Sequence, residues 1–264
     1  MEIKYTIQGL LIYAAIAAYA LAFITTLLRR EKVGHLLYLF GFIIAFCAFF
    51  YRWYYVGHIP LQNLFEVFLF LGMVIYPASL FCHYILRISE YSADMLIGAI
   101  VLFPAGFIFS AQPQQLPPAL QCWLFAPHVA AYMLSYIFMA KAASQAIYQL
   151  AGLNHNIDEN LLLYEQPTYR TICAGFPLLT LGLILGSCWG KLAWGDYWGW
   201  DPKELWSLAS WLVYLGYFHF RYMFGKSRPR INSIWAVAGL VFIVITLLWV
   251  NLSNLFSGLH SYAI

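Results

Sequence analysis

Residues 189–206 hold the densest group of tryptophan side chains in the chain. Within them lie five tryptophans and one tyrosine: Trp189, Trp194, Tyr197, Trp198, Trp200 and Trp206. Four of these tryptophans precede Asp201 in a glycine-rich segment without regular periodicity, at about residues 188–202, which links two long apolar runs. Tryptophan is rarely clustered in a loop for packing alone. The pattern therefore predicts an aromatic platform for a large planar ligand at a membrane surface.

Three histidines fall in short segments that lie on the same side as this platform. His58 lies in Gly-His-Ile-Pro, His128 in Ala-Pro-His-Val and His260 in Gly-Leu-His-Ser. Neutral imidazole is a common metal ligand and a frequent axial ligand of haem iron. The alternative for each histidine is an interfacial polar residue. Beside the tryptophan platform, we expect His128 and His260 to ligate one haem from opposite sides.

The sequence Asp201-Pro202-Lys203-Glu204 has the composition of a helix start. Aspartate suits the N-cap, proline the first helical position and glutamate the third, where its side chain returns to the cap amide. Asn63 and Glu66 repeat this pattern in Asn-Leu-Phe-Glu. Capping alone would explain these acids. It would also hold Trp198 and Trp200 at a helix N-terminus, which favours a nearby propionate.

Two further histidines lie inside apolar runs. His219 follows Lys203 by sixteen residues, or ~24 Å along a helix. Ionisable residues in membrane spans are functional candidates, and the alternative is a side chain that reaches the headgroups. We predict that His219, with Arg221 next to it for a propionate, belongs to a haem entry site. His83 has a weaker case and His35 a weaker one still.

These residues must be positioned by membrane helices, because the chain is 63% hydrophobic and only 9% charged. A span needs roughly 20 apolar residues. The sequence predicts an all-α integral membrane protein, with residues 1–264 as one polytopic domain of about eight spans. The predicted spans are Ile7–Leu28, Leu36–Tyr54, Leu64–Leu86, Asp94–Ser110, Trp123–Leu150, Thr171–Ser187, Lys203–Tyr222 and Ile234–Leu252.

Basic residues set the expected orientation, since cytoplasmic loops carry an excess of lysine and arginine. Alternation places ten of the fourteen on one face, which we interpret as the cytoplasm, and leaves Lys4, Arg52, Lys191 and Lys203 on the other. Both termini and the tryptophan segment are then outside. The first apolar run is expected to be a true span, because no small-residue cleavage site precedes Arg29. A net charge of +3 gives no reason to expect a nucleic-acid partner.

The cysteines form no C-x-x-C pair and no zinc-binding spacing, and most lie in apolar runs where cysteine packs as a small hydrophobe. Cys122 and Cys188 both fall near the predicted outer face. A disulfide between them is possible, but the sequence does not fix their distance.

The segment Trp194-Gly-Asp-Tyr-Trp-Gly-Trp-Asp-Pro-Lys-Glu204 is similar to the W-G-x-x-W-x-W-D-x-x-E signature of the tryptophan-rich (WWD) haem-handling proteins. The similarity continues through Leu205-Trp206-Ser207 and Tyr217-Phe218-His219. It extends to Gly57–Glu66 and to Gly258–Tyr262. Over nearly its full length the chain resembles the CcsA (ResC) family of System II cytochrome c biogenesis. The Pro-Lys-Glu continuation and the C-terminal histidine favour this family over the related CcmC and CcmF proteins.

The resemblance implies that haem b crosses the membrane and is attached to the two thiols of a C-x-x-C-H motif in apocytochrome c. His128 and His260 match the external axial ligands, and His219 matches the intramembrane histidine of the entry site. The haem-edge platform is matched by Trp194, Trp198, Trp200 and Asp201. The resemblance also implies a CcsB (ResB)-like partner, which carries a second intramembrane histidine. It implies the haem-presenting subunit of a haem-lyase complex, in a bacterial plasma membrane or a thylakoid membrane.

Two other classes remain open at this stage. A b-type electron-transfer subunit would hold haem permanently, and it usually needs histidine pairs on facing helices within the bilayer. A haem-binding regulator or assembly factor of similar fold would bind haem without transferring it. Neither a Ser-His-Asp arrangement nor a paired-carboxylate arrangement is evident in the sequence, so we expect the chain to contribute binding and orientation.

Overall fold

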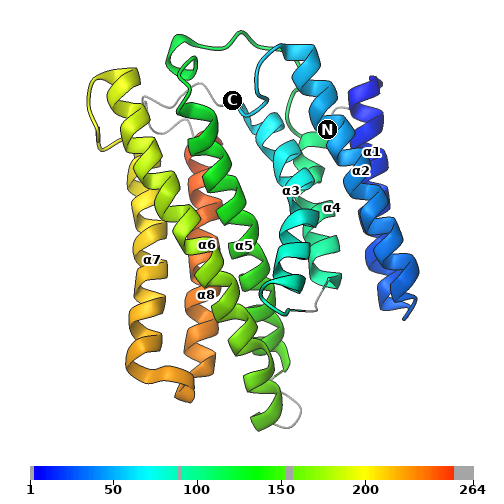
Figure 1. Cartoon of the computed structure of the whole chain (residues 1–264), viewed down its shortest axis with the longest axis vertical. Coiled ribbons are helices and arrows are strands. Elements are labelled where there is room, and N and C mark those ends of the chain that lie inside the picture. The colour runs from blue at the N-terminus through cyan, green and yellow to red at the C-terminus, as the bar shows by residue number, and fades with distance from the viewer. Residues whose placement is uncertain (1–2, 89–90, 153–156, 253–264) are drawn as a thin grey trace. The chain divides into compact units, whose positions relative to one another are not determined.

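A computed structural model of the protein describes residues 3–88, 91–152 and 157–252, and every regular element in these ranges is helical (Figure 1). The predicted all-α class is therefore confirmed. The chain forms two compact units, Met1–Gln121 (unit 1) and Cys122–Ile264 (unit 2). A single membrane domain over residues 1–264 stays a prediction.

Unit 1 contains four long helices, α1 (Ile7–Leu27), α2 (Glu31–Val56), α3 (Leu64–Tyr84) and α4 (Ser92–Phe107), followed by the short 3₁₀ helix η1 (Pro118–Leu120). The buried Tyr19 of α1 ties them together. Its ring lies so close to Gly41 of α2 and Gly98 of α4 that a Cβ at either glycine would come within 2.6 or 2.8 Å of it. Its hydroxyl donates to the Gly72 carbonyl of α3 at 2.9 Å.

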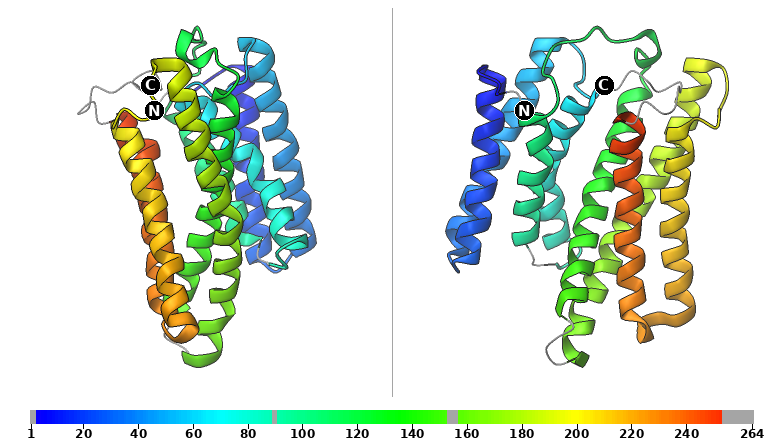
Figure 2. Two further views of the ribbon diagram at one scale, coloured as in Figure 1. Left: turned by 60° about the vertical axis from the view of Figure 1, so that its left-hand side comes forward. Right: turned by 180° about the vertical axis from the view of Figure 1, so that it is seen from behind.

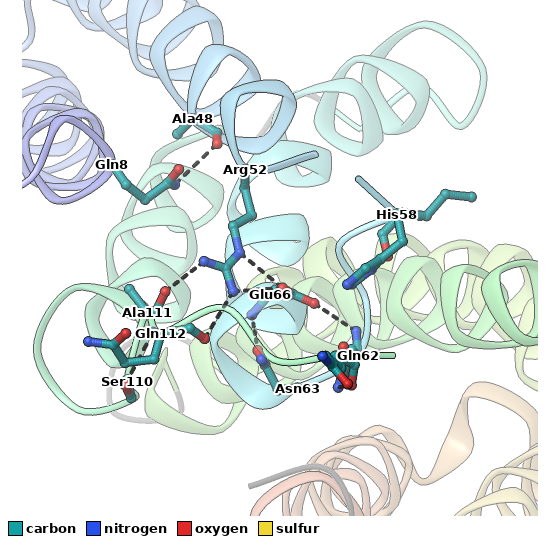
Figure 3. A network of polar contacts seen from close by, with 12 residues as sticks. Gln8, Ala48, Arg52, His58, Gln62, Asn63, Glu66, Ser110, Ala111 and Gln112 are labelled. Atoms are coloured by element: carbon teal, nitrogen blue, oxygen red, sulfur yellow. Dashed lines mark hydrogen bonds and ion pairs between the residues drawn. The ribbon is translucent and has the colours of Figure 1, made fainter. Parts of the chain in front are cut away.

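One end of unit 1 is held by a buried ion pair, shown in Figure 3. Arg52 Nε donates to Glu66 Oε1 at 2.9 Å, and both residues are almost fully buried. Arg52 also donates to the carbonyl of Ala111, at 2.6 Å. Asn63 caps α3 by accepting from the Glu66 amide at 3.0 Å, which confirms the predicted cap. The Glu66 carboxylate accepts from the amide of Gln62. These bonds fix the turn before α3 and the segment after α4.

Unit 2 contains α5 (Phe125–Ala151), α6 (Ile157–Trp194), α7 (Pro202–Phe224) and α8 (Pro229–Val244), which run side by side in Figure 2. The 3₁₀ helix η3 (Gly225–Ser227) joins α7 to α8, and α8 continues through the π-helical turn η4 (Ile245–Trp249) into α9 (Val250–Leu252). Glycines bring α5 and α6 together. A Cβ at Gly182 would lie 2.9 Å from the Tyr132 ring, and Ser135 donates to the Gly175 carbonyl at 2.9 Å.

Five helices among the described residues are long and apolar enough to cross a membrane: α1, α2, α3, α6 from Tyr164 to Trp194, and Pro229–Leu252. α4 is a shorter apolar helix. The helices α5 and α7 have sufficient length, 27 and 23 residues, but not sufficient apolar composition. In α5 the polar side chains of Lys141, Gln145 and Gln149 lower the apolar content, and all three are buried inside the structure. The helices support a multi-pass membrane protein, whereas eight crossings and outer termini stay predictions.

In α7 most of the polar residues lie on its more buried side. A stripe at three- and four-residue spacing, the polar stripe of α7, consists of Glu204, Ser207, Ser210, Tyr214, Tyr217 and Arg221. The exposed stripe of α7 consists of Leu205, Leu212, Leu215, His219 and Tyr222. Residues at this spacing share one helix face. α7 is therefore more polar inside unit 2 than on its surface, which explains its low apolar content.

The tryptophan segment is shorter as a loop than the sequence predicts. α6 continues through Gly190 to Trp194, so Trp189 and Trp194 are helical and the loop begins at Gly195. Gly195 has φ of 93°, a conformation that glycine adopts without strain and that ends the helix. The boundary at residue 188 is corrected to 195.

Candidate functional site

His128 lies in the first turn of α5, at the end of unit 2 that also carries the tryptophan loop (Figure 1). Its Nδ1 lies 2.9 Å from the Gly182 carbonyl oxygen of α6. A carbonyl oxygen only accepts hydrogen bonds, so Nδ1 carries the proton and Nε2 carries the lone pair. Metal-ligating histidines commonly have this arrangement, in which the ring nitrogen that does not bind the metal donates its N–H to a backbone carbonyl.

The His128 ring is enclosed by aromatic side chains and a glycine. Trp189, which is only 1% exposed, stacks on it with ring centroids 5.6 Å apart and planes inclined by 19°. Tyr132 meets its edge at 5.1 Å. On α6, a Cβ at Gly186 would lie 2.5 Å from Cε1 of the imidazole. The orientation of the ring is therefore fixed by α6 as well as by its own helix.

The tryptophans form two edge-to-face pairs. Trp189 and Trp194 lie 4.6 Å apart between ring centroids at the end of α6, and Trp198 and Trp200 lie 5.9 Å apart in the loop. Trp200 is 67% exposed, whereas Trp194 and Trp198 are half-buried. The exposed Tyr197 lies under Lys191, whose Nζ is 5.4 Å from the ring centroid.

Glu204 holds the loop in place around Trp200. Its Oε2 accepts from the amide of Gly199 at 2.8 Å and from that of Asp201 at 3.1 Å, the two neighbours of Trp200. Asp201, almost fully buried, accepts from the Lys203 amide at 2.9 Å, which completes the predicted capping box. Trp200 has φ of 57°, a left-handed conformation that costs a non-glycine residue about 1–3 kcal/mol. The capping box opposes that cost and displays the Trp200 ring to the surface.

The donor groups at this end of unit 2 suit haem. An imidazole with its lone pair on Nε2 is a standard ligand for haem iron. The indole Nε1 of Trp198 is buried and has no hydrogen-bond partner among the described residues. An indole N–H only donates, so it calls for an acceptor such as a propionate oxygen.

The second predicted external ligand, His260, lies outside the described residues. The structure therefore brings together His128, Trp189 and Trp194 in one cluster and Trp198, Trp200 and Asp201 in a neighbouring loop. Trp189, Gly186 and Glu204 were not predicted as site residues. The glutamate at the third helical position was the one available signal, because it marks a capping box.

His219 lies on the exposed stripe of α7, away from the interior of unit 2. Arg221 lies on the polar stripe instead and is engaged by Glu165 of α6, with Nε 3.0 Å from Oε1 and Nη2 donating to Oε2 at 3.0 Å. Its guanidinium also stacks on Tyr169 at 3.7 Å. Residues two apart on a helix point in different directions, so Arg221 does not share a face with His219. The expected pairing of Arg221 with a propionate beside His219 is therefore wrong.

The other described histidines lie in unit 1. His58, labelled in Figure 3, has Nδ1 3.1 Å from its neighbour's carbonyl oxygen at Ile59. His35 and His83 both contact the ring of Tyr91, at 4.6 and 5.1 Å. Cys122 and Cys188 both carry free thiols, so they do not form a disulfide.

The long apolar helices of the described residues are those of a multi-pass membrane protein. Residues 61–260 match the model of the family described as cytochrome C assembly protein. The chain is 32% identical over 251 residues to the cytochrome c biogenesis protein CcsA of Guillardia theta, covering 80% of this chain and 79% of that protein. The chain is 36% identical over 253 residues to the protein of the same name from Prochlorococcus marinus (strain MIT 9303). It is 32% identical over 256 residues to that from Parasynechococcus marenigrum (strain WH8102). These matches cover 80% of this chain and 78% and 80% of the relatives.

The chain belongs to the cytochrome c assembly protein family, among relatives named CcsA. This membership supports a role in cytochrome c biogenesis, in which haem is involved.

Proposed function

We propose that the chain binds haem b at the outer end of unit 2 and presents it to apocytochrome c for covalent attachment. His128 and His260 are the axial ligands, and Trp194, Trp198, Trp200 and Asp201 form the surface against which the haem edge lies. The reaction takes place on the outer face of a bacterial plasma membrane or a thylakoid membrane. The chain acts together with a CcsB (ResB)-like subunit as a haem-lyase complex.

The observation that carries this proposal is the held tautomer of His128. The Nδ1–H donates to the Gly182 carbonyl at 2.9 Å, which selects the neutral tautomer whose lone pair is on Nε2, the nitrogen that would ligate iron. Trp189 and Gly186 fix the ring from two sides. Trp198 Nε1 in the adjacent loop, for which the described part of the chain offers no hydrogen-bond acceptor, would supply a donor for a propionate. A histidine that only anchored the helix in headgroups would need none of this support.

The chemistry requires little of the chain beyond placement. For each thioether, the S–H bond of a cysteine and the π bond of a vinyl group break, and one S–C and one C–H bond form. No net oxidation occurs and no group leaves. Holding haem against two thiols replaces a bimolecular encounter with a reaction between groups that are already in place. This placement can lower the activation free energy by about 7–11 kcal/mol. Rigid support for His128 and Trp200 serves this placement.

His219 is proposed as the ligand of a haem entry site shared with the partner subunit. It lies on the exposed stripe of α7, where an unaccompanied ionisable side chain facing lipid is costly. A partner helix that covers this stripe would shield the imidazole and can bring a second histidine. The exposure of His219 therefore favours a site completed in trans over one enclosed by this chain.

A b-type electron-transfer subunit would need two histidines on facing helices. In the described part of unit 2, His128 lies in the first turn of α5 and His219 near the last turn of α7, at opposite ends of the unit. This arrangement does not provide a facing pair. A haem-binding regulator would use the same His128 site but would not transfer the haem.

A direct transfer assay separates these functions. The chain is co-expressed with its CcsB-like partner, purified with haem and incubated with a reduced peptide that contains C-x-x-C-H. We expect haem to become covalently bound to the peptide, seen on a denaturing gel and by the pyridine haemochrome spectrum. A peptide with serines in place of both cysteines is the control. Haem that stays on the chain while the peptide remains unlabelled would support the regulator or the electron-transfer subunit instead.

A further inference from the structure

The tryptophan loop, residues 195–201, is tied at its start to the surroundings of His128. Trp189 of α6 stacks on the His128 ring, and Trp194 meets Trp189 at 4.6 Å where α6 ends. The loop begins at the next residue. The helix that supports the histidine ring therefore also positions the start of the loop. The other end of the loop, at Asp201, opens α7, whose position is set by different contacts.

Several contacts hold α7 against α8 and α6. The helices α7 and α8 run side by side (Figure 2), and the ring centroids of Trp206 and Phe242 lie 5.6 Å apart between them. Trp211 donates its Nε1–H to Thr180 Oγ1 of α6 at 2.9 Å. None of these contacts involves α5, the helix that carries His128. The position of the loop's second end relative to the histidine therefore depends on a further contact.

Tyr132 supplies that contact between α5 and α7. It lies four residues after His128, on the same face of α5, and is 7% exposed. Its ring meets the edge of the imidazole at 5.1 Å, and a Cβ at Gly182 would lie 2.9 Å from the ring. Its hydroxyl forms a hydrogen bond with the Ser207 side chain and lies close to the Glu204 carboxylate. One side chain thus contacts the histidine, the α6 residue that accepts the histidine's proton, and α7.

The Tyr132 hydroxyl meets α7 at the turn that controls the loop. Ser207 follows Glu204 by three residues, and residues at this spacing lie on one helix face. The Glu204 carboxylate accepts from the amides of Gly199 and Asp201, on either side of Trp200 in the sequence. A shift of this turn relative to α5 would carry that part of the loop with it. The hydrogen bond to Ser207 therefore restrains the loop relative to the helix of the histidine.

We propose that Tyr132 is a positioning residue, which keeps the His128 side and the tryptophan-loop side of the haem site in register. This inference rests on the proposed function, because it takes haem to be ligated by His128 and to lie against the loop. The ring of Tyr132 supports the histidine, whereas only the hydroxyl reaches α7. Attachment requires the vinyl groups to be held against two thiols, and a small displacement of reacting groups lowers the rate. The hydroxyl therefore affects how fast haem is attached and not whether it binds.

Tyr132→Phe separates the two parts of this side chain, since phenylalanine keeps the ring and lacks the hydroxyl. The chain and its CcsB-like partner are purified with haem, and transfer to a reduced C-x-x-C-H peptide is timed. We expect unchanged haem content and an unchanged visible spectrum, with transfer slowed about tenfold, the order of one hydrogen bond. Ser207→Ala should cause the same loss, and the double variant no further loss. Tyr148→Phe, which changes an exposed tyrosine near the other end of α5, is the control and should match the unmodified complex.

Two results of this assay would overturn the positioning role and leave the proposed function intact. The first is transfer by Tyr132→Phe at the rate of Tyr148→Phe. The second is loss of haem from Tyr132→Phe, because the hydroxyl would then serve binding and not position. Failure of the unmodified complex to transfer haem would instead refute the proposed function.

Amide hydrogen exchange of the haem-free chain tests the same link without haem transfer. If the Tyr132 hydroxyl restrains the start of α7, Tyr132→Phe should speed exchange in residues 195–204, where Glu204 accepts from the amides of Gly199 and Asp201. Tyr148→Phe should leave exchange in this segment unchanged. Equal exchange in Tyr132→Phe and in the unmodified chain would overturn the link, whatever the outcome of the transfer assay.

Discussion

Gly186→Ala tests whether the position of the His128 ring determines function. The new Cβ would lie 2.5 Å from Cε1, 2.8 Å from Nδ1 and 3.4 Å from Nε2 of the imidazole. Carbon atoms pack at about 3.5–4.0 Å, so the ring must retreat by about 1 Å. Trp189 stacks on the ring and limits that retreat, and the 2.9 Å bond to the Gly182 carbonyl would be lost or lengthened.

Overpacking of this kind lowers the free energy of unfolding by about 1–3 kcal/mol, and a stable chain still folds after such a loss. A displacement of about 1 Å in a reacting geometry can cost about 100-fold in rate. We therefore expect Gly186→Ala to accumulate in membranes but to mature about 100-fold less cytochrome c. The assay is haem staining of a c-type reporter, normalised to the amount of chain by immunoblot.

Gly152→Ala is the matched control, because a Cβ there would meet nothing within 4 Å and the backbone has φ of −71°. A second comparison uses the His128→Ala background, in which the clash no longer exists. Gly186→Ala should then cause no further loss. Maturation by Gly186→Ala equal to that by Gly152→Ala would show that ring placement at His128 does not matter.

Three further changes test other parts of the account. Trp198→Phe and Trp200→Phe should insert normally but lower haem occupancy and cytochrome c maturation, because phenylalanine lacks the indole N–H and the larger ring. If haem occupancy and maturation both stay at wild-type level, the tryptophans only anchor the loop at the membrane interface. Glu165→Gln should lower the free energy of unfolding by about 3 kcal/mol in detergent, because it leaves Arg221 without its buried partner; a loss below 1 kcal/mol would contradict the assigned ion pair. His219→Ala should lower haem content in cells while the outer site still binds added haem, and normal loading would return His219 to an interfacial role.

The locally encoded features of the site could be predicted from the sequence. The caps at Asp201 and Asn63 depend on side chains that bond to amides two or three residues away, so short motifs reveal them. The clustering of Trp198 and Trp200 beside the start of α7 followed from the same motif. The long apolar runs likewise predicted helices.

Features that depend on distant parts of the chain could not be predicted. The pairing of Arg221 with Glu165 joins residues 56 positions apart, and it removed the expected role of Arg221 beside His219. The sequence predicts a loop at Trp189 because the segment is glycine-rich and lacks regular periodicity, yet α6 continues through Gly190 because one glycine costs a helix only about 1 kcal/mol. The need for glycine at residue 186 comes from His128, which lies on another helix.

The central claim is that His128 holds haem during its attachment to apocytochrome c, and one measurement tests it most directly. Cells that depend on this chain for cytochrome c maturation are grown with the unmodified chain, with His128→Ala and with His128→Ala in added imidazole, and covalent haem is measured on a c-type reporter. The account predicts loss of holocytochrome c in His128→Ala and partial recovery with imidazole, which can occupy the vacated coordination position. Full maturation by His128→Ala without imidazole would contradict it.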